Sequence, residues 1–233
     1  MTPTYRSALI VGVGDGLSAS LARAFAKAGM RVGLSARSTG KLSGLAAELD
    51  APTHACNASE PAAVAALFAA MDEALGGAPD VVVYNPSARV RGPLIELDPA
   101  EVQRALAVTA FGAFLVAQQA VKRMLPNRNG AVLLTGASAG VKGYPRSAPF
   151  AMGKFALRGL AQSMARELQP QGIHVAHFVI DGAIRSVGRA EPADRPDSML
   201  DPDAIARTYL DILRQDRSAW SWEVEVRPWT ETF

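Results

Sequence analysis

Apolar segments alternate with stretches of helical periodicity along the whole chain. The predicted strands occupy residues 8–11, 31–36, 53–56, 80–84, 131–135, 173–180 and 222–226. The predicted helices occupy residues 16–29, 39–49, 98–125 and 149–169, with one more after Ser59 and one from Asp201. Strands that are apolar along their length are typical of a parallel sheet with helices on both faces. The pattern predicts a single α/β domain over residues 1–233, doubly wound around a parallel sheet of about seven strands.

Two helices carry recognisable start signals. Ser59 is predicted to cap a helix whose apolar side chains recur at i, i+3, i+4 and i+7, namely Val64, Leu67, Phe68, Met71 and Leu75. Asp98 is predicted to cap the long helix 98–125, because a proline follows it at once and Glu101 lies three residues on.

Residues 183–200 form a polar stretch rich in glycine and proline inside the domain. In a doubly wound fold, ligands bind outside the carboxyl ends of the strands, and this stretch follows the predicted strand 173–180. Two interpretations remain open, an ordinary loop or a substrate lid.

Composition excludes several classes of protein. The chain has 24 Lys plus Arg against 22 Asp plus Glu, and no basic stripe that would indicate a nucleic-acid partner. Apolar runs such as 64–71 fall far short of the roughly 20 residues of a membrane span, and the start lacks the regions of a signal peptide. Cys56 is the one cysteine, which is typical of a reducing, cytoplasmic location. The histidines at 54, 174 and 177 lack metal-ligand companions, so no metal site is expected.

A glycine-rich turn follows the first predicted strand and opens the first predicted helix. It is Gly12-Val13-Gly14-Asp15-Gly16-Leu17-Ser18. Glycines let the backbone approach a pyrophosphate closely, and the helix N-terminus attracts its negative charge. A strand, a glycine turn and a helix in this order are what a dinucleotide-binding fingerprint requires.

The spacing of Gly12, Gly16 and Ser18 resembles the GxxxGxG loop of short-chain dehydrogenases/reductases, with serine at the third glycine. Three later segments resemble the family in the same order. Asn85-Pro86-Ser87-Ala88 resembles its Asn-Asn-Ala-Gly segment, and residues 154–160 resemble the start of its active-site helix. Asp181-Gly182 stands where the family has Pro-Gly after the sixth strand. The resemblance runs from about residue 6 to 230. It implies a Rossmann-type fold and a nicotinamide-dependent oxidoreductase.

The resemblance also implies which residues hold the cofactor: Gly12, Asp15, Gly16, Leu17, Arg37, Asn57, Asn85, Lys154 and the backbone near Ile184. An acidic residue ending the second strand would favour NAD, but Ala36 stands there and Arg37 follows. Arg37 suits a 2′-phosphate, so NADP is expected in preference to NAD. Asp15 counts against this, because some NADP-preferring relatives carry Lys or Arg there. Asn57 replaces the usual aspartate near the adenine.

The catalytic positions of the family are only partly retained. Lys154 matches the lysine that binds the ribose and lowers the pKa of a tyrosine four residues earlier, but that position is Phe150. The position of the helix asparagine is Thr109. The serine is ambiguous, because Ser138 lies twelve residues before Phe150, whereas the more usual spacing of thirteen falls on Ala137.

Phenylalanine has no proton to give, so another group would have to supply one. Tyr144, in the loop after the fifth strand, is a candidate, with a packing tyrosine as the other interpretation. Two functions stay open. One is an NADP(H)-dependent oxidoreductase that transfers hydride to a small carbonyl or an activated double bond. The other is a weak or inactive NADP(H)-binding protein that acts as a sensor or partner subunit.

Two further expectations concern what the protein binds. Arg89, Arg91 and Arg146 are expected to border the pocket, either as contacts to an acidic substrate or as solvated side chains. The resemblance implies a homodimer or homotetramer paired through helices 99–125 and 149–169. The apolar residues Trp222, Val224 and Val226 would either add a second contact or complete the monomer core.

Overall fold

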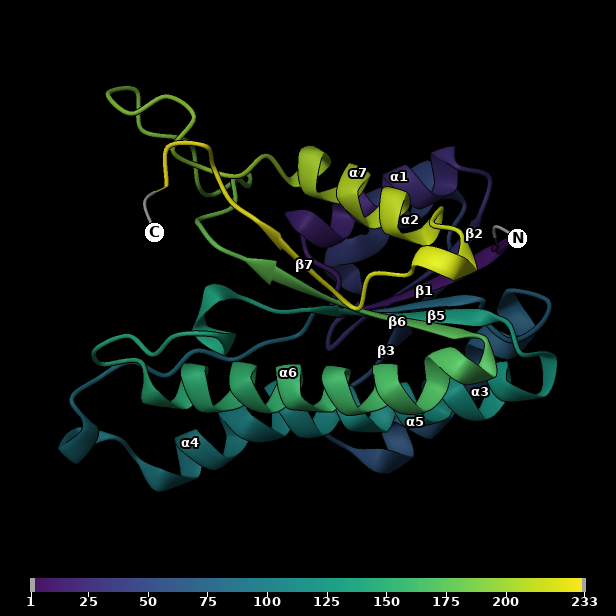
Figure 1. The fold of residues 1–233 in the computed structure, drawn as a ribbon, viewed down its shortest axis with the longest axis horizontal. Helices are drawn as coiled ribbons and strands as arrows, with labels where there is room; N and C mark the ends of the chain where they lie inside the picture. Colours follow the sequence, from purple (N-terminus) through teal and green to yellow (C-terminus); the bar gives the residue numbers. More distant parts are fainter. Residues whose placement is uncertain (1–2, 232–233) are drawn as a thin grey trace.

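Seven parallel strands form the centre of the molecule in the computed structural model, which describes residues 3–231 (Figure 1). The strands are β1 (Ser7–Val11), β2 (Arg31–Ala36), β3 (Thr53–Ala55), β4 (Val81–Tyr84), β5 (Gly130–Thr135), β6 (Ile173–Ile180) and β7 (Glu223–Val226). Their order in the sheet is β3-β2-β1-β4-β5-β6-β7, and every neighbouring pair is parallel. The predicted doubly wound α/β fold is confirmed.

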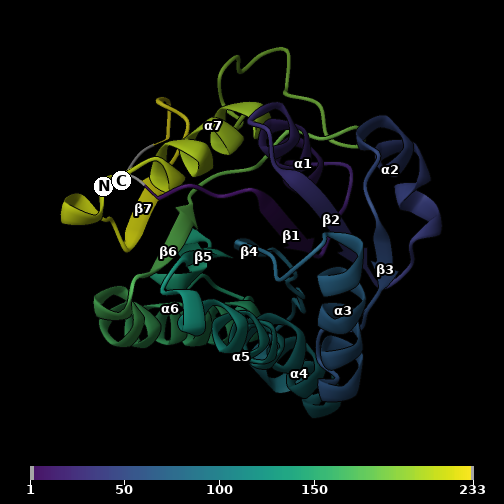
Figure 2. The same cartoon turned by 90° about the vertical axis from the view of Figure 1, so that its right-hand side faces the viewer.

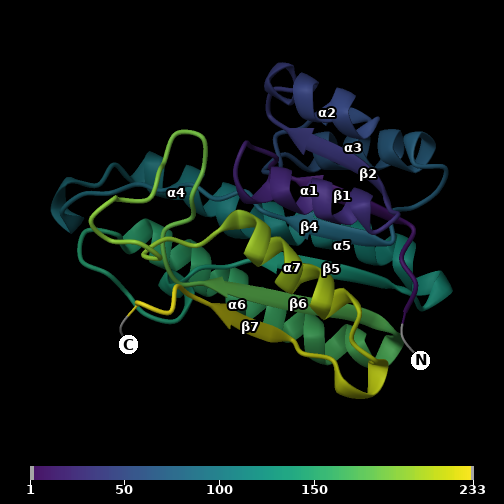
Figure 3. The same cartoon turned by 90° about the horizontal axis from the view of Figure 1, so that it is seen from above.

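Helices cover both faces of this sheet (Figure 2). One face carries α1 (Leu17–Lys27), α2 (Ser43–Leu49) and α7 (Pro202–Leu213), and α7 lies beside α1 in the view from above (Figure 3). The other carries α3 (Pro61–Ala74), α4 (Pro99–Leu106), α5 (Gly112–Met124) and α6 (Ala148–Leu168). In β1, Leu9 and Val11 join the apolar core on the α3–α6 side, and Ala8 and Ile10 join the core under α1 and α7. This double burial explains why the strands are apolar at consecutive positions.

A π-helical segment interrupts the predicted helix 98–125. The start is as expected, since the Asp98 carboxylate accepts a hydrogen bond from the Ala100 amide at 2.9 Å. Between α4 and α5, however, Ala107–Phe111 forms a π-helix. The buried Tyr84 hydroxyl donates to the carbonyl of Val108 within this segment. Such π turns are frequent at functional sites.

The continuous helix Pro99–Asn127 is the one helix in the described part of the chain that is long and apolar enough to cross a membrane. Its residues Ala113, Val116, Ala117 and Ala120 are buried in the apolar core beneath the sheet. Packing in that core accounts for its composition.

Helix α3 does not begin as the sequence predicts. Its first residue is Pro61 and its N-cap is Glu60, so the prediction that Ser59 caps it was wrong. A proline disfavours the helical conformation in the residue before it, and Glu60 is extended, with φ −109° and ψ 116°. Ser59 instead donates its hydroxyl to the side chain of Asn57 at 2.8 Å. The predicted apolar face of this helix is buried as expected.

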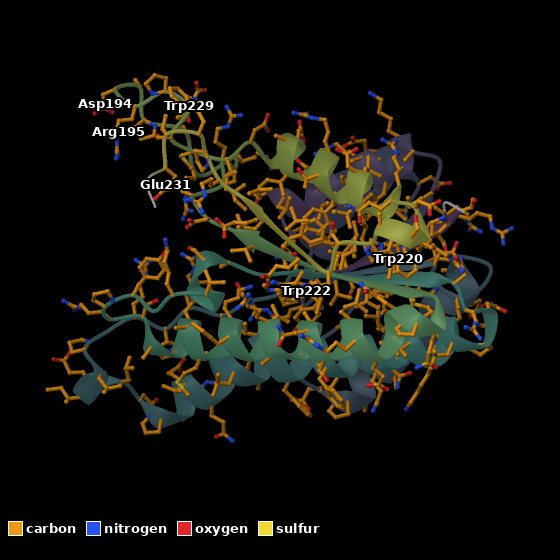
Figure 4. All side chains as sticks on the ribbon, viewed as in Figure 1. Asp194, Arg195, Trp220, Trp222, Trp229 and Glu231 are labelled. Carbon is orange, nitrogen blue, oxygen red and sulfur yellow. The ribbon has the colours of Figure 1, made fainter. Side chains whose placement is uncertain are left out.

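The loop 183–200 extends beyond the carboxyl ends of the strands, and the C-terminal segment lies against it (Figure 4). The Trp229 indole N–H donates to the Asp197 carboxylate at 3.2 Å, and the Thr230 hydroxyl donates to the Asp197 carbonyl at 3.0 Å. Asp197 holds a left-handed conformation with φ +59°. Trp229 and Thr230 therefore brace this loop, and we call these two residues the tail brace.

Candidate active site

A cleft of about 1080 Å³ opens at the carboxyl ends of β1, β4, β5 and β6. It is lined by the turns that follow these strands and by the start of α6. This edge of a doubly wound sheet is where ligands bind. Among the residues expected to contact a cofactor, Gly12, Gly16, Leu17, Asn85, Lys154 and Ile184 line the cleft.

Side chains from α1 and from the segment after β4 fix the conformation of the glycine turn after β1. Gly12 has φ +85°, and a Cβ there would lie 2.6 Å from Pro86, so a larger residue does not fit. The Ser18 hydroxyl donates to the Gly12 carbonyl at 3.1 Å, and the Asn85 amide donates to Ser18 Oγ at 2.6 Å. The serine at the third glycine position therefore joins the turn to the segment after β4.

The turn fits the pyrophosphate of a dinucleotide. No side chain caps the first turn of α1, and no acidic residue lies in it. A Cβ at Gly14 would meet no atom within 4 Å, so the space beside its backbone is open. Uncapped amide groups and the positive end of a helix attract a phosphate anion.

The structure leaves Asp15, Arg37 and Asn57 outside the cleft lining. Asn57 Oδ1 is already occupied by the amide and hydroxyl of Ser59. The cleft instead receives Lys41, from the short 3₁₀ turn Gly40–Leu42 after β2. Sequence reasoning missed Lys41, because the path of this connection is not set by its local sequence.

Lys154 is the buried cation of the site. Its ammonium donates to the Thr135 carbonyl at 2.6 Å, which ties α6 to the end of β5. Only 3% of its surface is exposed. Burial, and secondarily the charge of Arg89, lower its pKa from 10.5 to about 7.

Phe150 lies one helical turn before Lys154 and carries no hydroxyl. Its ring is buried and packs with Ala137 and Ala139. The guanidinium carbon of Arg89 lies 4.3 Å from the ring centroid, and Lys154 Nζ lies 5.9 Å from it. Cations at these distances are attracted by the face of the ring.

A pair of hydroxyl groups lies in the same cleft. Tyr144 donates its hydroxyl to Ser138 Oγ at 3.0 Å, and both residues line the cleft. Of the two candidates for the serine position, Ser138 carries the hydroxyl, while Ala137 packs against Phe150. The structure therefore brings together Ser138 and Tyr144.

Thr109 lies behind the cleft rather than in its lining. It belongs to the π segment, is 1% exposed, and accepts a hydrogen bond from the Ala88 amide at 3.1 Å. Its hydroxyl fixes the segment after β4.

Basic side chains dominate the lining. Seven basic residues face two acidic ones, namely Lys41, Arg89, Arg91, Arg146, Lys154, Arg185 and Arg189 against Asp181 and Glu231. The sequence predicts Arg89, Arg91 and Arg146 at the pocket, and all three line it; the structure adds Arg189. Asp181 is buried and lies 3.7 Å from both Lys142 and Arg227.

The two histidines of β6 pack inside the protein. His174 stacks on Trp220 with ring centroids 4.5 Å apart, and His177 Nδ1 lies 3.0 Å from the Glu223 carboxylate. Burial lowers the pKa of His177 to about 4, so its imidazole is neutral at physiological pH. No group of three or more His, Cys, Asp or Glu side chains that could hold a metal occurs within residues 3–231.

Comparison with known proteins places the chain in a family. The family model described as short chain dehydrogenase matches residues 6–191. The protein named inactive 2-(S)-hydroxypropyl-CoM dehydrogenase 2, from Xanthobacter autotrophicus, is 32% identical over 80% of each chain. The 3-oxoacyl-[acyl-carrier-protein] reductase MabA of Mycobacterium bovis is 28% identical over 77% of this chain and 69% of its own.

Solved structures agree over nearly the whole length. A short-chain dehydrogenase from Rhodopseudomonas palustris is 31% identical with a TM-score of 0.83, over 97% of this chain and 100% of that one. A metagenomic short-chain oxidoreductase in complex with NADP is 28% identical with a TM-score of 0.83, over 98% and 99% of the two chains. This chain belongs to the short-chain dehydrogenase family of NAD(P)-dependent oxidoreductases.

Proposed function

We propose that this protein is an NADP(H)-dependent oxidoreductase that acts on a small carbonyl compound or an activated double bond. The observation that carries the proposal is Lys154, buried and fixed to the end of β5 in the cleft that also contains the glycine turn. Bound NADP(H) would supply or accept the hydride. A solved relative is described in complex with NADP, which supports this choice of cofactor.

The chain's own residues divide the remaining tasks. Lys154 would hold the ribose next to the nicotinamide, and Ser138 would orient the substrate oxygen. Phe150 stands at the family's tyrosine position, so the proton would come from Tyr144 through its hydrogen bond to Ser138. Reduction of an activated double bond would not require a proton donor at position 150 at all.

A second candidate function is an NADP(H)-binding protein with little or no turnover. Two observations favour it: Phe150 lacks a hydroxyl, and the Thr109 hydroxyl already accepts from Ala88. A relative 32% identical to this chain is itself named inactive.

The deciding experiment pairs an NADPH binding titration with NADPH consumption on a panel of ketones, aldehydes and enoyl compounds. Turnover that Tyr144→Phe and Ser138→Ala both abolish supports the enzyme with its proton from Tyr144. Binding without turnover on the whole panel supports the second function. Absence of NADPH binding would exclude both.

The preference for NADPH over NADH is expected to depend on the basic residues Arg37 and Lys41 after β2. NADPH should bind at least tenfold more tightly than NADH, about 1.4 kcal/mol, because Ala36 leaves no acid to repel a 2′-phosphate and basic residues follow it. Fluorescence titration of Arg37→Ala and Lys41→Ala would show which side chain carries the preference. Arg195→Ala, at the exposed loop tip, is the matched control (Figure 4). Equal affinities for NADPH and NADH in the wild type would contradict the prediction.

We further propose a homodimer or homotetramer. Phe111, Phe114, Met152 and Phe155 are each more than 40% exposed on the π segment, α5 and α6, the surfaces through which the resemblance implies pairing. The residues Trp222, Val224 and Val226 instead pack against the two cores of the monomer.

Light scattering at micromolar concentration is expected to give twice or four times 24.5 kDa. Phe155→Glu should shift the protein toward monomer, because it places a charge on this apolar face. A wild-type species of 24.5 kDa would contradict the proposed oligomer.

A further inference from the structure

Three arginines of the cleft lining have no acidic partner in the part of the chain that the structure describes. Arg89, Arg91 and Arg189 all line the cleft, and none forms an ion pair within residues 3–231. A neighbouring arginine of the same lining behaves differently, since Arg185 pairs with Asp201 at 3.2 Å. We call these three residues the arginine cluster.

The cluster concentrates like charge around one guanidinium. Arg89 rests on the Phe150 ring, and partial burial followed by the charges of Arg91 and Arg189 lowers its pKa. Arg89 in turn lowers the pKa of Lys154. Mutual repulsion of this kind is unfavourable until an anion lies between the cations.

The fold holds the loops of the cluster in place. The Ala88 amide donates to Thr109 in the π segment, and the Gly92 amide donates to the Arg146 carbonyl at 3.1 Å. Arg146 adopts a left-handed conformation, with φ +59°, which is strained for a residue other than glycine. On the other side, Ser186 and Arg189 exchange backbone hydrogen bonds at 3.1 and 2.9 Å.

The glycine turn and the arginine cluster serve different ends of the cleft. The turn offers backbone amides and a helix N-terminus to a pyrophosphate. Arg89 instead contacts Phe150, which packs against Ala137 and Ala139 on either side of Ser138. The Arg89 charge is therefore positioned to bind the substrate rather than the pyrophosphate of the cofactor.

We propose that Arg89, supported by Arg91 and Arg189, binds an oxyanion group of the substrate, a carboxylate, sulfonate or phosphate. The planar guanidinium fork matches such groups with two parallel hydrogen bonds. The reacting carbonyl or double bond would then lie toward Ser138 and Tyr144. The inference rests on the proposed function in that the anion belongs to the molecule being reduced or oxidised, but anion binding itself is measurable without turnover.

Calorimetric titration with a matched ligand pair tests the proposal. The probes are 4-oxopentanoate and its methyl ester, which share the ketone and differ in charge, each titrated with and without saturating NADPH. Wild type is expected to bind the acid about tenfold more tightly than the ester. Arg89→Gln should bring this ratio close to one, and Arg195→Gln, the same change at the loop tip, should keep it. Excess methanesulfonate should compete with the acid.

Several outcomes would overturn the proposal. They are equal affinity for acid and ester, an acid preference that survives Arg89→Gln, and absence of binding of either probe. A loss of NADPH affinity in Arg89→Gln would assign Arg89 to the cofactor and also refute it, while the oxidoreductase proposal would stand. Failure of wild type to bind NADPH would refute the proposed function, and the titrations without cofactor would still decide the anion site.

Discussion

Phe150→Tyr is expected to raise ketone and aldehyde reductase activity by roughly 10²-fold or more, the lower range of a general-acid contribution. The two rings have the same size, so the substitution adds one hydroxyl within a helical turn of Lys154. Lys154 Nζ already lies 5.9 Å from the ring centroid, and a nearby cation favours the phenolate form of a tyrosine. Steady-state NADPH consumption on generic ketones and aldehydes measures the gain.

Tyr144→Phe is the matched control for that gain, because it removes a hydroxyl from the same cleft. Thr109 remains in both proteins, so full recovery of activity is not expected. Brisk wild-type turnover that Phe150→Tyr leaves unchanged and Tyr144→Phe abolishes would assign the proton to Tyr144. If no carbonyl compound oxidises NADPH with either protein, the prediction fails and the binding-protein function gains support.

Lys154→Met is expected to stabilise the protein without cofactor while it weakens NADPH binding. Burial lowers the pKa of Lys154 to about 7, against 10.5 when unfolded, so below pH 7 the fold holds a buried charge. Each pKa unit corresponds to about 1.4 kcal/mol, and part of the gain is lost with the hydrogen bond to Thr135, so we expect roughly 2–4 kcal/mol at pH 7. Such an exchange of binding for stability is common at functional sites.

The pH dependence of the free energy of unfolding tests this prediction. Between pH 7 and 10.5 the unfolded chain binds the Lys154 proton and the fold does not, so the wild-type free energy of unfolding rises with pH across this window. Lys154→Met should remove that slope, and Lys27→Met, at the exposed end of α1, should keep it. Urea unfolding from pH 6 to pH 10 measures both. A Lys154→Met protein that is less stable at pH 7, with the slope unchanged, would contradict the interpretation.

The sheet was predictable because both of its faces are covered. Burial on two sides makes β1 and β6 apolar at nearly every position, and this pattern marks parallel strands between helices. The glycine turn was equally predictable from the sequence. A Cβ at Gly12 would clash with Pro86, so this position requires the glycine that marks the motif. The spacing of the family pattern predicts Lys154 at the site, and the structure has this residue in the cleft lining.

Other features depended on contacts between distant segments. The π segment Ala107–Phe111 leaves no compositional trace, because it is one displaced turn of hydrogen bonds inside an ordinary apolar helix. Arg189 and Lys41 reach the cleft through loop paths that local sequence does not determine. The Ser59 cap failed for a local reason, the constraint that Pro61 imposes on Glu60.

The tail brace decides how the protein should be handled. Trp229 and Thr230 bond to the loop 183–200 through Asp197, whereas the chain enters β1 at the amino ends of the strands, where the Arg6 amide donates to Asp80. We therefore expect an affinity tag or surface attachment at the C-terminal end to disturb this loop, whose residues 183–186 and Arg189 line the cleft. The same attachment at the N-terminal end leaves the cleft untouched. Purification handles, fluorophores and immobilisation chemistry therefore belong at the start of the chain.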